Sequence, residues 1–316
     1  MTKPFIRPDV AALLAMIEAS GRPPLHQFGA VEARAGSNAA RAIMEVELGE
    51  LALVRDVEMP GPAGPIPARL FDAKAERAAG DLIVYFHGGG FVIGDLDSHA
   101  PLCADVSRLM DMPVISVDYR LAPEHPFPAG PDDAIAAARW LAAHSGELGR
   151  EATRLVLMGD SAGANLALLA AIDLRDEPGA VPVAAQGLIY PVTGPVAHEG
   201  SGRDFAEGYF LTRPLMNWFD GHYAPQLGDW RHETRLRGVH GLPSTALITA
   251  SLDPLRDQGR ALAAALAGEG IDTAYLEARG NIHGFATMRR LIPSARHDIE
   301  RFCAALLMLI ERAGDE

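Results

Sequence analysis

Residues 155–165 read LVLMGDSAGAN, and this stretch decides the fold of the chain. Four apolar residues lead directly into a Gly-x-Ser-x-Gly pentapeptide at 159–163, and a helix-favouring stretch follows at 164–174. Between a strand and a helix, this pentapeptide is typical of a nucleophile elbow, a sharp turn that exposes a serine hydroxyl. We expect glycines on both sides of Ser161 because a Cβ there would collide with the neighbouring strand or helix. The alternative is an ordinary strand-to-helix turn in which Ser161 only caps the helix.

Apolar strand patterns alternate with helical patterns on both sides of this turn. Buried strands are expected at 81–86, 113–117, 154–158, 186–190, 245–250 and 273–277. Helices are expected at 98–110, 131–146, 161–175, 256–268 and 293–312. This alternation predicts an α/β fold with a mostly parallel sheet covered on both faces. Before it, imperfect alternation at 45–58 and a second run at 66–72 predict a hairpin.

Two segments do not follow the alternation. An amphipathic helix at 8–20 and a weaker helical stretch within 28–43, interrupted at Gly36, precede every strand. Between 191 and 240 there is no strand pattern, yet 205–223 holds six of the chain's 20 aromatic residues, counted as 3 Trp, 6 Tyr and 11 Phe. Such an excursion either forms a small satellite core or covers a binding site.

Composition and charge exclude several classes of protein. The chain has 316 residues, 48% apolar and 22% charged, as in an ordinary globular protein of one large domain or two smaller ones. A formal net charge of −13 argues against binding to nucleic acid or to anionic membrane surfaces. Cys103 and Cys303 lie within apolar patterns and are expected to be buried free thiols, consistent with a reducing compartment. We see no secretory signal and no apolar run long enough for a membrane span, so we expect a cytoplasmic protein.

A glycine-rich motif, HGGGF at 87–91, directly follows the 81–86 strand. Three successive glycines let backbone N–H groups approach a ligand closely, as an oxyanion hole beside a nucleophile requires. A dinucleotide-binding turn is the alternative, but Gly88, Gly90 and Gly94 lack the G-x-G-x-x-G spacing, and no helix pattern begins there.

Candidate partners for Ser161 follow later strands. Asp253 comes directly after the 245–250 strand, and His283 lies in a loop with glycines on both sides. The order serine, aspartate, histidine along the chain is one of those found in Ser-His-Asp triads. A helix-capping aspartate would look the same in sequence, and Asp257 is the reserve candidate. His297 falls in an amphipathic helical pattern and is expected to be solvated.

The stretch DYRLAPEHPFPA at 118–129 follows a strand and has the composition of a hydrogen-bonded brace. With HGGGF, GDSAGAN at 159–165, DPLRDQG at 253–259 and HGF at 283–285, it resembles the bacterial hormone-sensitive-lipase-like esterases, family IV of the lipolytic enzymes. The resemblance extends over about 70–290. Residues 279–281, Arg-Gly-Asn, depart from the acidic or hydrophobic run that is commoner before the histidine.

The resemblance implies an α/β-hydrolase fold, with a mostly parallel eight-stranded sheet flanked by helices and a helical cap. Residues 1–45 match the N-terminal helical arm of the cap, and 46–316 match the catalytic domain, into which 195–225 is inserted as the second cap part. Ser161 would be the nucleophile, His283 the base and Asp253 the residue that orients it. The expected oxyanion donors are the N–H groups of Gly89, Gly90 and Ala162. Support for the glycine loop is expected from His87, Asp118, Tyr119, Arg120 and Glu124. The expected pocket residues are Phe91, Phe205, Tyr209, Phe210, Leu211, Trp218, Ile282 and Phe285.

The function implied is hydrolysis of short- to medium-chain carboxylic esters through an acyl-enzyme intermediate. No metal or organic cofactor is required, and the expected partner is a small ester rather than nucleic acid. The sequence leaves both a monomer and a homodimer open. The alternative is a non-catalytic receptor of the same fold that binds a small ligand beneath its cap. Such relatives usually lack the triad histidine.

Overall fold

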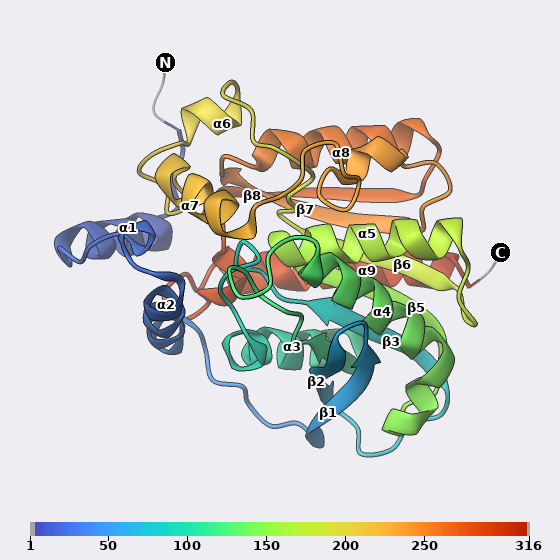
Figure 1. Ribbon diagram of the computed structural model, residues 1–316. Helices are drawn as coiled ribbons and strands as arrows, with labels where there is room; N and C mark the ends of the chain where they lie inside the picture. The colour runs from blue at the N-terminus through green and yellow to red at the C-terminus, as the bar shows by residue number, and fades with distance from the viewer. Residues whose placement is uncertain (1–3, 315–316) are drawn as a thin grey trace.

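A single eight-stranded sheet forms the centre of the computed structural model, which describes residues 4–314 (Figure 1). The strand order is β1-β2-β4-β3-β5-β6-β7-β8. The strands are β1 Leu53–Gly61, β2 Gly64–Asp72, β3 Gly80–Phe86, β4 Val114–Val117, β5 Ala152–Asp160, β6 Val183–Ile189, β7 Ser244–Leu252 and β8 Thr273–Ile282. β2 pairs antiparallel with β1 and β4, and every pairing from β4 to β8 is parallel. The predicted hairpin and mostly parallel sheet are therefore confirmed.

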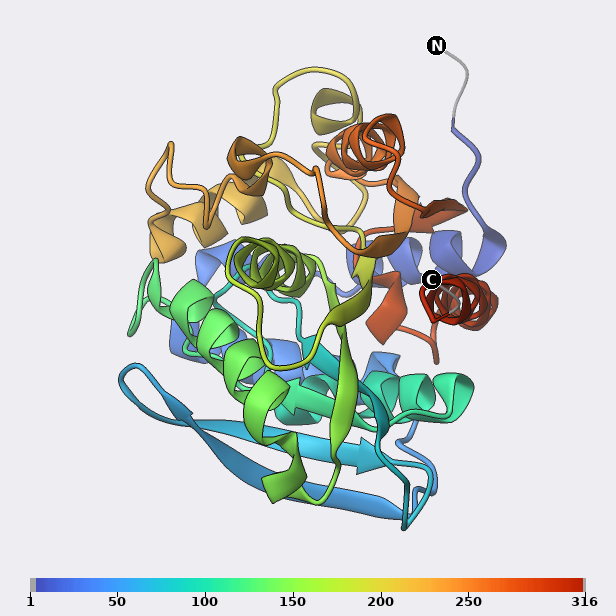
Figure 2. The same ribbon diagram turned by 90° about the vertical axis from the view of Figure 1, so that its right-hand side faces the viewer.

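Helices cover both faces of the sheet (Figure 2). They are α1 Pro8–Ala19, α2 Ala30–Met44, α3 Leu96–Met110, α4 Ala129–His144, α5 Ala162–Asp176, α6 Ser201–Asp204, α7 Arg213–Tyr223, α8 Arg256–Gly268 and α9 Ala295–Arg312. Buried residues of α4, α5 and α8 pack with one face of the sheet, and those of α3 and α9 with the other. Within residues 4–314, no helix combines the length and the apolar character needed to cross a membrane.

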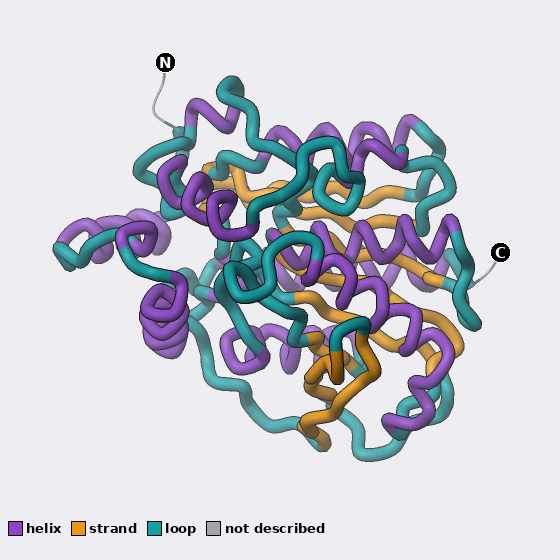
Figure 3. The backbone as a smooth tube through the Cα atoms, in the orientation of Figure 1, coloured by secondary structure: helices purple, strands orange, loops and turns teal. Residues whose placement is uncertain are grey.

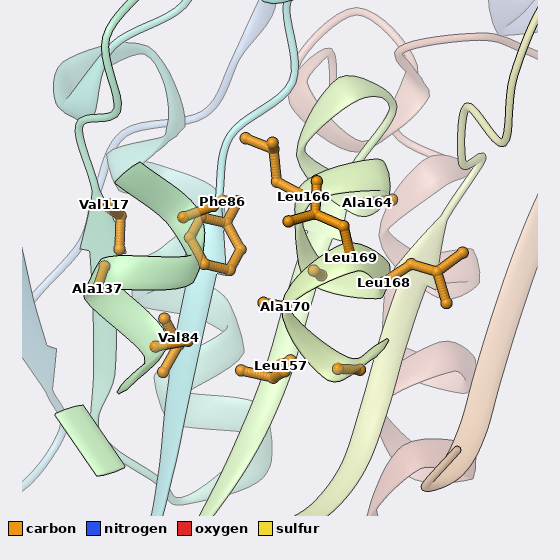
Figure 4. Close-up of a cluster of buried hydrophobic side chains, with 14 of the residues drawn as sticks. Val84, Phe86, Val117, Ala137, Leu157, Ala164, Leu166, Leu168, Leu169 and Ala170 are labelled. Atoms are coloured by element: carbon orange, nitrogen blue, oxygen red, sulfur yellow. The ribbon is translucent and has the colours of Figure 1, made fainter. Parts of the chain in front are cut away.

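Successive residues of a strand point to opposite faces of the sheet, so the core consists of two main clusters, one on each face. On β3, Leu82, Val84 and Phe86 join the cluster beneath α4 and α5, whereas Ile83 and Tyr85 join the cluster on the α3 and α9 side. Figure 4 shows Val84 and Phe86 facing the leucines of α5 in the first cluster. Because both faces are buried, the central strands are apolar at almost every position, as the sequence shows.

The two cysteines are buried free thiols, as expected. Cys103 lies on α3 and Cys303 on α9, and burial raises the pKa of each thiol to about 12. Both groups are therefore neutral at physiological pH.

Several elements differ from their predicted bounds, among them the first strand, α2 and β8. The strand expected from residue 45 begins at Leu53, because side chains bind the backbone of the preceding segment: Arg108 donates to the carbonyls of Leu48 and Glu50. α2 continues through Gly36, since one glycine weakens a helix by about 1 kcal/mol without ending it. β8 extends five residues beyond the predicted 277, to Ile282, which pairs with Leu252 after a register shift.

The N-terminal arm and the β6–β7 excursion lie at the same edge of the sheet, where the parallel strands end (Figure 1). Most of the excursion is loop (Figure 3), with α6, α7 and a short turn, Thr234–Arg237, as its regular elements. The two segments touch: the Trp218 indole N–H donates to the carbonyl of Phe28 at 3.2 Å. The helix expected near Thr212 is α7, capped by the Thr212 side chain.

Candidate active site

The turn between β5 and α5 has the geometry of a nucleophile elbow. Ser161 has φ 54° and ψ −117°, a backbone conformation that costs a non-glycine residue about 1–3 kcal/mol. A Cβ on Gly159 would lie 2.4 Å from the carbonyl oxygen of Gly163, and one on Gly163 would lie 1.9 Å from that of Phe86. The expected steric need for both glycines is confirmed.

Ser161, His283 and Asp253 form a continuous chain of hydrogen bonds. His283 Nε2 lies 2.8 Å from Ser161 Oγ, and His283 Nδ1 lies 2.7 Å from Asp253 Oδ2. The other carboxylate oxygen, Oδ1, accepts the N–H of Leu255 at 2.8 Å. Asp253 therefore makes the backbone contact typical of a capping residue and contacts the histidine as well, so the two sequence interpretations do not exclude each other.

The sheet topology brings these three residues together. Ser161 follows β5, Asp253 follows β7 and His283 follows β8, and parallel strands present their carboxyl ends at one edge. One expectation is wrong: Ser161 is only 9% exposed, because chain from outside the sheet covers this edge.

The reserve candidates lie in other surroundings. Asp257 accepts the N–H of Ser201 at 2.8 Å, and its other carboxylate oxygen pairs with Arg256. Its contacts therefore tie α8 to the start of α6. His297 is 73% exposed on α9 and lies 3.7 Å from Glu300, as expected for a solvated helix residue.

The HGGG loop needs its glycines for two different reasons. Gly89 and Gly90 have φ of +129° and +60°. A Cβ on Gly89 would lie 2.0 Å from the carbonyl oxygen of Ile93, and one on Gly90 would lie 2.4 Å from the ring of Phe219. No acceptor within residues 4–314 takes the N–H groups of Gly89, Gly90 or Ala162. These donors are therefore available to a ligand.

Asp160 anchors the loop to the elbow, a role that its sequence position did not reveal. Its Oδ1 accepts the Gly88 N–H at 2.8 Å and the Tyr85 hydroxyl at 2.9 Å, and lies 3.2 Å from His99 Nε2. Burial by itself would raise the pKa of Asp160, but the interactions with His99, Arg41 and Tyr85 outweigh it and hold the pKa well below its usual range. The sequence signal for this role of Asp160 was a carboxylate placed between an apolar strand and the serine.

Tyr119, for which the DYR stretch predicts a supporting role, contacts the loop at His87. Its hydroxyl donates to the carbonyl of His87 at 2.7 Å, and its ring stacks on the His87 imidazole with centroids 4.4 Å apart. His87 has no exposed surface, and burial lowers its pKa to about 3. His87 is therefore neutral, and it serves as a packing surface for the loop.

Arg120 and Glu124 contact other segments than the loop. Arg120 binds Asp133 on α4, with Nη2–Oδ1 at 2.8 Å, and Glu124 binds Arg34 on α2, with N–O at 2.6 Å. Arg34 itself reaches the loop, because its Nε donates to the carbonyl of Val92 at 2.7 Å. Glu124 is therefore linked to the loop through Arg34 of the N-terminal arm, which lies outside the 118–129 motif.

Asp118 does not act as a brace through its side chain. No donor within residues 4–314 binds its carboxylate, while its backbone N–H donates to Pro67. Burial, together with smaller effects of the nearby Asp95 and Asp97, raises the pKa of Asp118 to about 6 against the opposing effect of Arg69. Ionised Asp118 is therefore a destabilising group.

Asp118→Asn should increase the free energy of unfolding at pH 8 by about 3 kcal/mol. A carboxyl whose pKa rises from 3.8 to about 6 on folding costs nothing below pH 4. Its cost grows as the pH rises from 4 to 6 and is constant above. Urea unfolding of both proteins at pH 4 and pH 8 tests this: the gain should be absent at pH 4. An equal difference at both pH values would contradict it.

The predicted pocket residues divide into two groups. Phe91 stacks on Tyr223 with centroids 3.9 Å apart, and Phe205 meets Tyr209 edge to face at 5.2 Å. Phe210, Leu211 and Trp218 also lie in the excursion. Ile282 and Phe285 differ from these in having no exposed surface, so no open pocket reaches them, although they share the core cluster on the α9 side with Phe205.

Phe219 was not among the predicted pocket residues, although it lies against the HGGG loop. The sequence signal that could have identified Phe219 is its position directly after Trp218 in a helix rich in aromatic residues. It meets Trp218 edge to face at 5.3 Å, and its ring covers the face of Gly90 where a side chain would project.

Comparisons with known proteins agree with the fold. A family model described as the alpha/beta hydrolase fold matches residues 83–287. The chain is 34% identical over 315 residues to the ethyl acetate hydrolase of Pseudomonas putida, covering 95% of this chain and 98% of that protein. It is 40% identical over 251 residues to the carboxylic ester hydrolase LipN of Mycobacterium tuberculosis, covering 75% of this chain and 65% of LipN.

A solved structure agrees over nearly the whole chain. An ester-hydrolase from the metagenome of Lake Arreo, complexed with a derivative of bipyridine phosphonate, is 37% identical with a TM-score of 0.90. The match covers 96% of this chain and 98% of that protein.

Proposed function

The chain belongs to the hormone-sensitive-lipase-like, family IV carboxylesterases of the α/β-hydrolase fold, and from this premise we propose that Ser161, His283 and Asp253 hydrolyse short- to medium-chain acyl esters. The observation that carries the proposal is the continuous hydrogen-bond chain Ser161–His283–Asp253, with its links at 2.8 and 2.7 Å. It ends at a serine on a strained turn beside free N–H donors, which is the geometry that acyl transfer requires.

The first half of the reaction acylates Ser161. Its Oγ bonds to the ester carbonyl carbon while His283 Nε2 takes the hydroxyl proton. The carbonyl electron pair moves to oxygen, and the N–H groups of Gly89, Gly90 and Ala162 stabilise this oxyanion; each donor is worth roughly 3 kcal/mol. The oxyanion then collapses, the C–O bond breaks, and the alcohol leaves with the proton from His283.

The second half regenerates the enzyme. His283 takes a proton from water as the water oxygen bonds to the acyl carbon, and a second oxyanion forms in the same place. Its collapse breaks the bond to Ser161 Oγ, which recovers the proton, and the carboxylic acid is released. In both halves, Asp253 accepts a hydrogen bond from Nδ1–H of His283, which leaves Nε2 able to take a proton.

The substrate range follows from the cover over the site. We assign the N-terminal arm, 1–45, and residues 195–225 to one cap, since Trp218 and Phe28 join them. A covered serine favours small esters over long triglycerides, because a closed pocket holds only a few hundred Å³. The name of the Pseudomonas putida relative, ethyl acetate hydrolase, supports a short acyl group.

Phosphonate labelling tests the proposal directly. A fluorophosphonate should form a covalent adduct on Ser161, and p-nitrophenyl butyrate should be hydrolysed by the unlabelled protein but not by the labelled one. A wild-type protein that forms no adduct and hydrolyses no ester would contradict the proposal and favour a non-catalytic receptor.

Phe219→Ala should shift the substrate preference towards longer acyl chains by about 10-fold in relative kcat/KM. Removing the ring opens space over Gly90, and an alkyl chain can then occupy the volume that Phe219 fills. The measurement compares p-nitrophenyl acetate, butyrate and octanoate. Phe219→Leu keeps most of the bulk and is the matched control, which should resemble the wild type. An unchanged chain-length profile in Phe219→Ala would place the acyl pocket elsewhere.

A further inference from the structure

Tyr190 occupies a strained backbone position directly after β6. Its φ is +36°, which is rare for an aromatic residue, and the side chain is only 1% exposed. The Tyr190 N–H donates to the carbonyl of Ile248 on β7 at 2.7 Å, which ties the strained residue to the neighbouring strand. Strain of this kind persists where the surrounding contacts hold it, and it often marks a functional site.

The ring of Tyr190 lies against the imidazole of His283. Their centroids are 4.5 Å apart with an interplanar angle of 51°. The ring of Tyr190 also meets Phe285 edge to face at 5.2 Å. Phe285 is fully buried, so the Tyr190 ring is itself in contact with a residue of the core. The position of the imidazole is thereby restricted on a side that neither Ser161 nor Asp253 contacts through hydrogen bonds.

The hydroxyl of Tyr190 points to the anchor of the HGGG loop. It lies 3.4 Å from Asp160 Oδ2, while Asp160 Oδ1 accepts the Gly88 N–H at 2.8 Å. Burial raises the pKa of Tyr190 well above its usual range, so the hydroxyl keeps its proton and can donate. One side chain therefore contacts both the proposed base and the carboxylate that holds the proposed oxyanion loop.

We propose that Tyr190 is a positioning residue that aligns His283 with Ser161 and ties that alignment to the HGGG loop through Asp160. The inference rests on the proposed function. The ring of Tyr190 contributes more to this positioning than the hydroxyl does, because the ring limits how far the imidazole can rotate away from Ser161 Oγ. A displacement of about 1 Å in such a site costs about 100-fold in rate.

The test distinguishes the contribution of the Tyr190 ring to kcat from that of the Tyr190 hydroxyl. Tyr190→Leu removes the ring and keeps apolar volume, and Tyr190→Asn removes it with a residue that tolerates positive φ. Tyr190→Phe keeps the ring and removes only the contact with Asp160. Tyr275→Phe is the control for the loss of a tyrosine hydroxyl, since the Tyr275 hydroxyl lies 2.7 Å from that of Thr249 and, among residues 4–314, binds neither Asp160 nor His283. Rates are expressed per active site, titrated with a fluorophosphonate to completion, so that a misfolded fraction does not count.

Tyr190→Leu and Tyr190→Asn should each lower kcat for p-nitrophenyl butyrate by about 100-fold with KM within 2-fold of wild type, and should slow phosphonate labelling equally. Tyr190→Phe should recover kcat to within about 10-fold of wild type. Tyr275→Phe should lower the melting temperature and leave kcat per site within about 2-fold. Wild-type kcat in a folded Leu or Asn variant would overturn the inference, as would a loss in Tyr275→Phe equal to theirs.

Two further outcomes are decisive. If neither ring-removing variant folds, Tyr190→Phe decides alone: kcat lowered by at least 3-fold at unchanged KM supports the tie to Asp160, and kcat equal to wild type overturns it. A wild-type protein without esterase activity would instead contradict the proposed function, which distinguishes the two failures.

Discussion

Ser161→Ala should lower kcat for ester hydrolysis by about 10⁵- to 10⁶-fold. The covalent intermediate cannot form without Oγ, and only the oxyanion donors and substrate binding remain. The free energy of unfolding should change by no more than about 1 kcal/mol, because alanine keeps the strained backbone of φ 54° and loses one hydrogen bond to His283. Initial rates with p-nitrophenyl butyrate and urea unfolding of the same samples measure both quantities.

The companion variant shows whether the two residues act as one unit. His283→Ala should lose nearly as much activity, and the double variant should lose no more than Ser161→Ala alone, since each single change already disables the same step. His297→Ala is the control and should keep wild-type kcat, because that histidine is 73% exposed on α9. Substantial activity in His283→Ala, or a large loss in His297→Ala, would show that the base is misassigned.

The sheet and its helices could be predicted from the sequence because each element carries its own pattern. β3, β5 and β7 are buried on both faces and read as continuous apolar runs, and turn residues separate them from amphipathic helices. The meeting of Ser161 with Asp253 and His283 follows from the same pattern, since parallel strands end at one edge.

Contacts between distant segments could not be predicted in the same way. Arg34 reaches the carbonyl of Val92 from a helix 58 positions earlier, and nothing local distinguishes it from a solvated arginine. The segment after Glu45 alternates like a strand, yet it pairs with none because Glu45 binds the buried Arg289 and Arg108 takes the neighbouring carbonyls. In both places a long-range ion pair or hydrogen bond outweighs the local pattern.

The cover over the site is a further consequence of long-range packing. A nucleophile elbow by itself implies an exposed hydroxyl, but Ser161 is 9% exposed. Phe219 reaches the HGGG loop from α7, and Trp218 joins α7 to the N-terminal arm. The aromatic density of 205–223 indicated either a satellite core or a cover; in the structure Leu211 and Met216 pack with Leu255, while the ring of Phe219 lies against Gly90.

Asp253→Asn should lower kcat by about 10⁴-fold while the protein stays folded. The carboxylate now uses Oδ1 for the Leu255 N–H and Oδ2 for His283 Nδ1. An asparagine can keep its oxygen on Leu255, which leaves its NH₂ group facing Nδ1. The imidazole must then accept at Nδ1 and carry its proton on Nε2, where it can no longer take the proton of Ser161.

Asp257→Asn is the matched control for this change, four residues along the same chain segment. Its carboxylate holds Ser201 and Arg256, and no histidine contact is recorded for it within residues 4–314. It should lower stability by about 1 kcal/mol at most and leave kcat within about 2-fold of wild type. Rates at saturating p-nitrophenyl butyrate, with circular dichroism to check folding, compare the two. If Asp257→Asn were the damaging change and Asp253→Asn the mild one, the orienting carboxylate would have to be reassigned, because the tautomer argument applies only to the residue that contacts Nδ1.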